Sequence, residues 1–98
     1  MPAAKRAGST NGSKPGSMDV VRKAVQQVAA LTGRPVEGVL GLRRADDGWE
    51  VTVEVLELRR IPDSTDVLAA YEVALDESGE LREYHRARRY ARNQTEED

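Results

Sequence analysis

The feature that most constrains this chain is a strict alternation of apolar and polar residues over positions 49–55. Apolar side chains occupy the odd positions from Trp49 to Val55, and polar side chains occupy the even positions between them. A period of two puts the apolar set on one face of a β-strand and the polar set on the other. Such a strand fits an antiparallel sheet that is covered on one side only. The rest of the chain must supply the neighbouring strands and the cover.

The alternation changes phase just after this strand. Leu56 and Leu58 are apolar, whereas Glu57 between them is polar. A β-bulge produces a one-residue slip of this kind, because it inserts an extra residue into one strand of a pair. Burial of both faces near residues 55–58 explains the same pattern, and the sequence leaves both interpretations open.

A helix is predicted over residues 17–33. Ser17 can cap its first turn, Gly33 can end it in the left-handed conformation, and Pro35 prevents its continuation. Apolar residues recur at intervals of three and four, which makes one apolar stripe. The stripe consists of Val21, Ala24, Val25, Val28 and Leu31. This stripe is the predicted cover for the alternating strand.

A first short strand is predicted at residues 39–42, before the alternating strand. The segment 45–48 supplies a hairpin turn between the two, because Asp and Gly accept a positive φ. Trp49 and Tyr71 are expected to anchor the core, because a chain without Phe has few large rings to bury.

Two later segments are harder to assign. Residues 67–75 fit both a helical stripe and a strand, but the turn chemistry of 76–79 favours a strand that ends at Leu75, with a helical turn at 66–69. Residues 81–92 have two polar faces. They predict either an edge strand or the start of a helical tail.

Together these segments predict an α+β fold: one N-terminal helix packed on an antiparallel sheet of three or four strands, with disordered termini. Residues 1–16 are small, polar and basic, and are expected to form a disordered leader. Residues 94–98 form a short acidic tail that is expected to fray. The folded domain is therefore expected to span residues 17–93.

The composition argues against most catalytic chemistry. Cysteine is absent, so disulfides, thiol nucleophiles and thiolate metal sites are excluded. His85 is the only histidine, Asp63 and Asp66 fit turn caps better than metal ligands, and no glycine-rich phosphate loop is present. We therefore expect no enzyme, no metal and no cofactor. The net charge of −2 and the lack of a long apolar run predict a cytoplasmic protein without membrane contact.

Arginine and tyrosine gather near the C-terminal end, and this segment is the candidate partner-binding site. Its members are Arg82, Tyr84, Arg86, Arg88, Arg89, Tyr90 and Arg92. Strand alternation would put five of them on one face and Arg89 on the other. The five are Arg82, Tyr84, Arg86, Arg88 and Tyr90. Three explanations stay open for the arginines: pairing across the sheet with Glu50, Glu54 and Glu57, binding of an acidic protein, or binding of single-stranded nucleic acid. An exposed sheet edge offers a second route to a partner, through strand addition.

The ordered motifs over about residues 18–92 resemble the gas vesicle protein O (GvpO) family. The pieces that carry the resemblance are Trp49 with its alternation, R-I-P-D at 60–63, D-V-L at 66–68, Y-E-V at 71–73, L-D…G-E-L at 75–81 and Y-x-R-x-x-R-Y-x-R at 84–92. Residues 1–16 match nothing in the family.

The resemblance implies a non-enzymatic accessory protein that is needed for gas vesicle formation and acts in the cytoplasm, in association with the vesicle or its precursors. Its expected partners are other gas vesicle proteins, either accessory or shell components. The alternative that the resemblance leaves open is a small regulator of vesicle gene expression that contacts RNA or DNA through residues 82–92. The resemblance carries over no catalytic residue.

Overall fold

The helix α1 (Ser17–Thr32) is the first element of the computed structural model, which describes residues 16–94. Val20, Ala24 and Val28 are fully buried, and this spacing of four residues marks the face that contacts the sheet. The predicted stripe is confirmed for Ala24 and Val28, and Val21 and Val25 are partly buried. It missed Val20, which is fully buried, and it wrongly included Leu31, which is 48% exposed.

The two ends of α1 test the capping predictions. Gly33 has φ 68° and its N–H donates to the carbonyl of Ala29 at 2.9 Å, so the predicted left-handed C-cap is confirmed. The prediction that Ser17 caps the helix is wrong. Ser17 is already the first helical residue, Gly16 takes the N-cap position, and no side chain in the described part of the chain caps it. A glycine here costs only a few tenths of a kcal/mol relative to a capping side chain.

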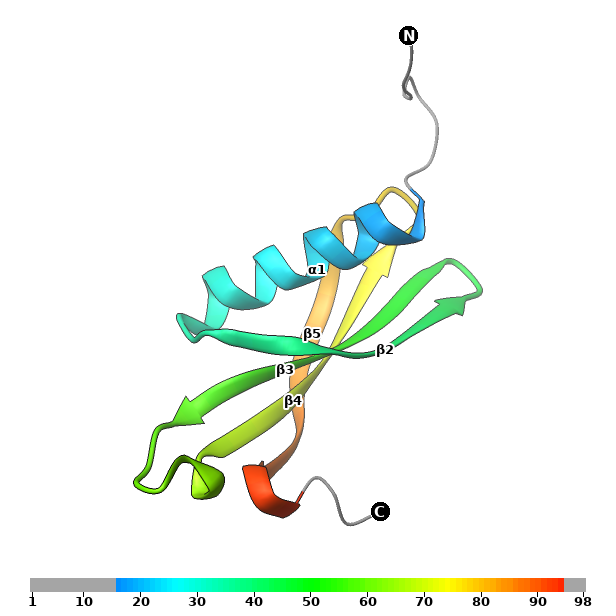
Figure 1. The fold of residues 1–98 in the computed structure, drawn as a ribbon. Coiled ribbons are helices and arrows are strands. Elements are labelled where there is room, and N and C mark those ends of the chain that lie inside the picture. The colour runs from blue at the N-terminus through cyan, green and yellow to red at the C-terminus, as the bar shows by residue number, and fades with distance from the viewer. Residues whose placement is uncertain (1–15, 95–98) are drawn as a thin grey trace, which may run out of the picture.

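Four antiparallel strands follow in the order β2-β3-β4-β5, which confirms the α+β prediction (Figure 1). The strands are β2 (Val36–Ala45), β3 (Gly48–Leu58), β4 (Val67–Asp76) and β5 (Leu81–Ala91). Two short 3-10 helices, η1 (Asp63–Thr65) and η2 (Arg92–Gln94), precede β4 and follow β5. β2 and β5 are the two edges of the sheet.

The assignments for the two ambiguous segments are resolved in favour of strands. β4 is a strand throughout, and the predicted helical turn at 66–69 is wrong, because the turn lies earlier, at η1. β5 is an edge strand and only η2 beyond it is helical. β2 is longer than the predicted strand at 39–42, because it pairs with β3 along ten residues.

The core forms where α1 lies across one face of the sheet, over β2, β3 and β4 (Figure 1). Val51, Val53 and Val55 are fully buried against it, as the alternation predicted. Burying each of these valines stabilises the fold by about 1.5–3 kcal/mol. Trp49 and Tyr71 contact this core from its border and are only partly buried, so valines and alanines, rather than rings, fill the centre.

Both explanations for the phase change in β3 are correct. The pairing of β3 with β4 shifts between Leu56 and Leu58, which makes Glu57 the extra residue of a bulge. Val55 and Leu56 are also both buried, although they face opposite sides of the sheet.

The two hairpin turns depend on glycine for different reasons. Gly79 has φ 89°, as predicted for the turn at 76–79, and Asp76 Oδ1 accepts hydrogen bonds from the N–H groups of Ser78 and Glu80. At Gly48 a positive φ is not the reason. A Cβ there would lie 1.9 Å from the carbonyl oxygen of Leu75, so glycine is needed for the close approach of β3 to β4. The predicted leader lies outside the described residues apart from Gly16, and the predicted tail apart from Gln94.

Candidate partner-binding surfaces

The two tyrosines of β5 lie on opposite faces of the sheet, which contradicts the predicted single face. Tyr84 is opposite Val73, which is part of the core under α1, whereas Tyr90 is opposite Leu68, which faces away from the helix. Two shifts of register between β4 and β5 change the phase of the edge strand along its length. No single face of β5 therefore presents both rings to a ligand.

Most arginines of this segment pair with acids of the same chain. Arg86 and Arg89 both contact the carboxylate of Glu57, at 3.3 and 2.9 Å. Glu57 lies on β3, so these side chains cross over β4, where Ala69 is the small residue between Val55 and Arg89. The Glu57 side chain is only 7% exposed, because the arginines cover it. The prediction of pairing across the sheet is confirmed for Glu57.

The other two acids named in that prediction have different partners. Glu50 pairs with Arg43 of β2, and Glu54 accepts a hydrogen bond from the hydroxyl of Tyr90 at 2.6 Å. Partial burial and the bond to Glu54 raise the pKa of Tyr90 to about 12. Tyr90 is therefore an internal anchor of β5 on the face that α1 leaves uncovered.

Arg82 and Arg88 differ in how much of their charge is neutralised. Arg82 contacts Asp47 of the β2–β3 turn at 2.8 Å, and this hydrogen bond and charge lower the pKa of the Asp47 carboxyl. The Arg88 guanidinium lies 5.3 Å from the centre of the Tyr90 ring, and residues 16–94 supply no carboxylate within ion-pair distance of it. Tyr84 contacts the ring of Tyr71, with centroids 6.0 Å apart.

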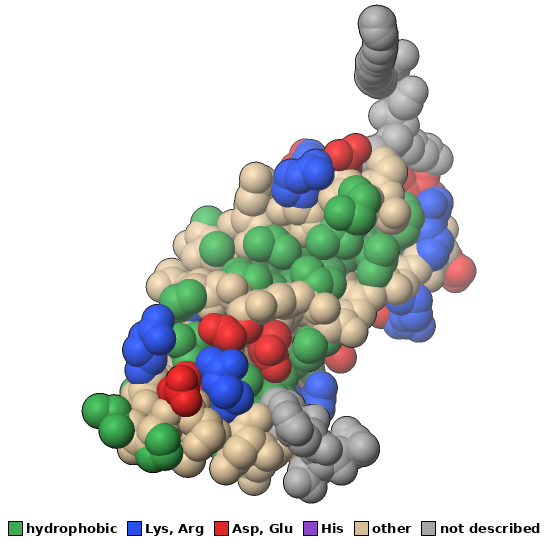
Figure 2. Space-filling model, viewed as in Figure 1, with side chains coloured by type: hydrophobic (Ala, Val, Ile, Leu, Met, Phe, Trp, Pro, Cys, Tyr) green, Lys and Arg blue, Asp and Glu red, His purple; other side chains and the backbone are tan. Residues whose placement is uncertain are grey.

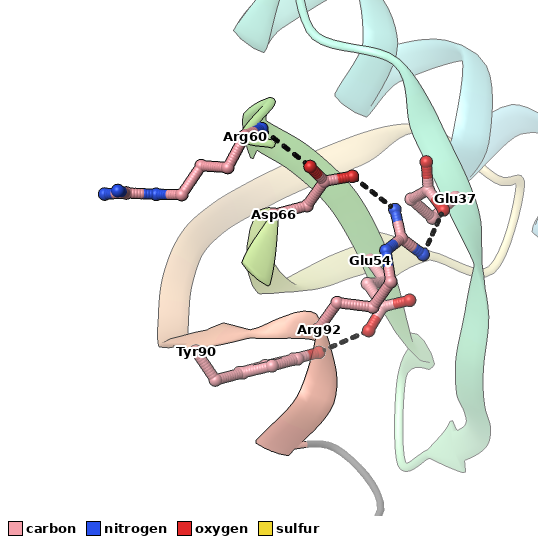
Figure 3. A network of polar contacts seen from close by, with 6 residues as sticks. All are labelled: Glu37, Glu54, Arg60, Asp66, Tyr90 and Arg92. Carbon is pink, nitrogen blue, oxygen red and sulfur yellow. Dashed lines mark hydrogen bonds and ion pairs between the residues drawn. The ribbon is translucent and has the colours of Figure 1, made fainter. Parts of the chain in front are cut away.

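A buried carboxylate joins the ends of three strands (Figure 3). Asp66 is 2% exposed; its Oδ1 accepts the N–H of Arg60 at 2.8 Å, and its Oδ2 contacts Arg92 at 3.1 Å. Arg92 also contacts Glu37 of β2 at 3.2 Å. The Arg60 N–H and the Arg92 guanidinium hold the pKa of Asp66 below its usual value, although burial opposes this.

This network holds the segment between β3 and β4 in one conformation. Within the segment, Thr65 donates to the carbonyl of Pro62 through both its N–H and its hydroxyl, at 3.1 and 2.8 Å. The Ile61–Pro62 peptide bond is cis. Asp66 has no local signal in the sequence for this role, because Arg92 lies 26 residues further along the chain.

The segment presents two apolar side chains and two cations to solvent. We call residues 58–61 the basic tip. Ile61 is fully exposed and Leu58 is 45% exposed. Neither guanidinium, that of Arg59 or that of Arg60, is in ion-pair contact with a carboxylate of residues 16–94, although the charge of Arg59 helps to lower the pKa of Asp66. Figure 3 shows the Arg60 side chain extending away from Asp66. Figure 2 shows hydrophobic side chains protruding at the end of the molecule where this segment lies in Figure 1.

A second apolar surface lies along α1 and β2, which we call the α1–β2 seam. Figure 2 shows hydrophobic side chains gathered in a band over these two elements. The large exposed apolar residues of the seam are Met18 and Leu31 on α1 and Val39, Leu40 and Leu42 on β2. The sequence predicted Leu31 as core and 39–42 as a strand, but not that they share an exposed surface.

The described residues show no constellation typical of catalysis. Residues 16–94 contain no group of three metal-ligating side chains placed to hold an ion, and they include no helix long and apolar enough to cross a membrane. A cleft of about 370 Å³ lies on the face opposite α1. Its lining includes three carboxylates, those of Glu50, Glu72 and Glu83. Arg43 pairs with Glu50, and His85 Nε2 lies 3.2 Å from Glu72.

Comparison with known proteins finds one family. The family model of the gas vesicle synthesis protein GvpO matches residues 3–96. The expectation that residues 1–16 match nothing in the family is therefore wrong, because the match begins at residue 3. A gas vesicle protein O of Streptomyces sp. is 50% identical over 82 residues, which cover 84% of this chain and 64% of that protein. Gas vesicle protein O1 of Halobacterium salinarum is 36% identical over 77 residues, 79% of this chain and 62% of that protein.

A gas vesicle protein O of Haloferax mediterranei is 31% identical over 84 residues, 85% of this chain and 60% of that protein. The chain therefore spans about three-fifths of the length of the curated relatives it matches. No solved structure gives a significant match.

Proposed function

The chain belongs to the gas vesicle synthesis protein GvpO family, and on that premise we propose that it is a non-enzymatic accessory protein of gas vesicle formation. It acts in the cytoplasm through contacts with other gas vesicle proteins during assembly. The observation that carries this proposal is the basic tip, where a fully exposed isoleucine stands on a segment held by the buried Asp66.

Rigid presentation of Ile61 favours a role in binding. Full exposure leaves the whole apolar side chain in water, and burying it in a partner would recover about 1.5–3 kcal/mol. Because the segment is already held by Asp66 and by the Pro62 carbonyl, little conformational entropy is lost when the partner binds. Residues of this kind, anchored on a fixed backbone, are typical of interaction hot spots.

The charges of the tip indicate the partner's chemistry. Arg59 and Arg60 directly precede Ile61, and neither guanidinium is in ion-pair contact with a carboxylate of residues 16–94, although the Arg59 charge acts on Asp66. The complementary surface is therefore an apolar pocket with an acidic rim, because opposite charges orient the encounter of two proteins. A gas vesicle protein with such a pocket is the proposed partner of the tip.

The predicted site on β5 is a weaker candidate for the same role. Of its arginines, all but Arg88 have carboxylate partners, and the rings of Tyr84 and Tyr90 face opposite sides. This arrangement also gives less support to the alternative function, contact with vesicle-gene RNA or DNA, which needs free cations beside rings that stack bases.

The proposal is tested by comparing Ile61→Asp with Ser64→Asp in cells that form vesicles. Both substitutions add one negative charge to the same exposed segment, but only the first removes the apolar side chain. We expect Ile61→Asp to reduce vesicle yield and the capture of vesicle proteins by the tagged chain at least tenfold, and Ser64→Asp to leave both near wild type.

Half of each captured sample is treated with nuclease. Vesicle proteins that survive the treatment support assembly contacts, whereas partners that vanish with it favour the nucleic-acid alternative. Normal vesicle yield and normal capture with Ile61→Asp would show that the tip is not the contact. Ile61 is fully exposed, so its replacement should not alter the melting temperature.

A further inference from the structure

The outer edge of β2 carries features of a contact surface that the proposed function does not use. β2 is an edge strand ten residues long, and residues 38–42 at its centre carry no charge. An exposed apolar edge is a template for pairing with another chain, and proteins that avoid such pairing place charges, proline or bulges there. The centre of β2 has no charge and no proline, and its one such feature is a bulge at Leu40.

The exposed side chains of this edge belong to the α1–β2 seam. Val39, Leu40 and Leu42 are 39–48% exposed. Figure 2 shows hydrophobic side chains gathered in a band over α1 and β2. Leu40 is the extra residue of a bulge, because the register with β3 shifts between Val39 and Gly41. The bulge places two large apolar side chains in succession at the middle of the edge.

The charges of β2 are distributed unequally along its length. Glu37 lies near the beginning of the strand, and Arg43 and Arg44 lie near its end. When two copies of such a strand meet antiparallel, the acidic end of each lies beside the basic end of the other. A parallel arrangement would put like charges together.

We propose that two copies of this chain form a symmetric dimer in which their β2 edges meet antiparallel around Leu40. A two-fold axis perpendicular to the sheet makes this contact self-complementary, since the same patch serves both copies. With Leu40 at the axis, the strand order places Glu37 of each copy opposite Arg43 of the other. Both α1 helices then lie on the same face, and the two seams form one apolar surface.

Side chains carry more of this contact than the main chain does. Bulges at Glu37 and Leu40 twist β2 and interrupt a regular ladder of hydrogen bonds. Glu37 and Arg43 already have partners in their own copy, Arg92 and Glu50, so the charges chiefly set orientation. The apolar contact between the seams supplies the attraction.

The first test is the mass of the purified full chain in solution, measured by sedimentation over a range of concentrations. We expect a dimer in the wild type and at least a tenfold higher dissociation constant in Leu40→Glu. Leu58→Glu is the matched control, because Leu58 is exposed to a similar degree but lies on the basic tip. It should leave the dimer unchanged.

A crosslink tests the geometry, and the chain suits it because it contains no cysteine. Two cysteines form a disulfide only when their Cα atoms are within about 7 Å. Leu40→Cys should therefore give a covalent dimer under mild oxidation, whereas Ile61→Cys, which lies at a more exposed position, should not. A wild type that is monomeric throughout, equal effects of Leu40→Glu and Leu58→Glu, or equal crosslinking at both positions would overturn the proposal. Ile61→Asp leaves β2 untouched, so failure of the tip contact and failure of the dimer are distinguishable.

Discussion

The two edge strands of the sheet, β2 and β5, expose opposite kinds of side chain to a possible neighbouring chain. β5 carries charged residues along most of its length, and five of the eight residues at positions 82–89 are Arg or Glu. β2 is uncharged at its centre and exposes three large apolar side chains. A charged edge resists pairing with another chain, whereas an apolar edge invites it. The sheet is therefore closed to strand addition at one side and open at the other.

The arginines of β5 and those of the basic tip also differ in whether they contact acidic side chains of the same chain. Arg86 and Arg89 of β5 turn inward, over the small side chains of β4, and contact Glu57, and Arg92 of η2 contacts Asp66. Such charges stabilise the domain but are no longer available to a partner. The guanidinium groups of Arg59 and Arg60 are in ion-pair contact with no carboxylate of residues 16–94, although the charge of Arg59 acts on Asp66. A count of arginines along the sequence therefore points to the wrong place for the free charge.

The largest expected effect is on folding, and it compares a substitution in the inner strand β3 with one in the edge strand β2. Val53 and Val39 are direct partners in the β2–β3 ladder, but Val53 is fully buried and Val39 is 39% exposed. Val53→Asp should unfold the domain, because an unpaired buried charge costs more than the about 5 kcal/mol that a small domain can spare. Val39→Asp should leave it folded. Circular dichroism during thermal melting measures both, and a cooperative transition in Val53→Asp would contradict the assignment of faces.

The next largest effect is on thermal stability, and it concerns Asp66, which contacts Arg92 just after β5. The pKa of Asp66 is lowered in the folded state, so its carboxylate stabilises the fold above the unfolded-state value of about 3.9, and this stabilisation is lost as the pH falls through the folded-state pKa. Asp66→Asn should melt several degrees below wild type at neutral pH.

The difference between the two proteins should shrink as the pH falls from about 4 toward the lower folded-state pKa of Asp66, below which the wild-type carboxyl is also neutral. Melting curves at a series of pH values measure it. A constant difference over the whole range would mean that the charge of Asp66 does not contribute.

The smallest expected effect is on the free energy of unfolding, and it concerns the ion pairs that the charged edge strand β5 makes with Glu57. Glu57→Gln removes the shared partner of Arg86 and Arg89, and we expect a loss of about 1 kcal/mol, because both arginines are half exposed and regain water. Glu80→Gln is the control, since Glu80 and its partner Lys23 are exposed and 3.9 Å apart. Urea unfolding compares the two.

Glu57→Gln should also bind immobilised single-stranded RNA more strongly at low salt, because it frees two cations. No gain in retention would mean that β5 lacks a nucleic-acid surface even when its arginines are released.

The local pattern of the chain was sufficient for most of the fold. The alternation at 49–55, the glycine at 33 and the turn at 76–79 each depend on neighbours in sequence, and each was confirmed. The faces of β5 could not be predicted in this way. Its alternation is interrupted by bulges that arise from pairing with β4, so Tyr84 and Tyr90 are separated by a feature that lies outside their own segment.

In the candidate binding surfaces, too, some features follow from the local sequence and others depend on contacts between distant residues. That arginines pair across the sheet follows from the number of acids on β3, but the choice of Glu57 depends on the bulge that turns it toward β5. The exposure of Ile61 depends on Asp66 and Arg92, which meet only after β4 and β5 have paired.

Hydrophobic period and turn chemistry act over a few residues, so most elements and their order could be predicted from the amino-acid sequence. The family was predicted from the resemblance of its ordered motifs. Which charges are neutralised and which apolar side chains stay in water became known from the folded chain alone. Those outcomes depend on contacts between residues far apart in the chain, such as Glu37 with Arg92, 55 positions away. The exposure of a side chain is decided when the whole chain has folded. In this protein, exposure distinguishes the side chains that stabilise the fold from those that are available to a partner.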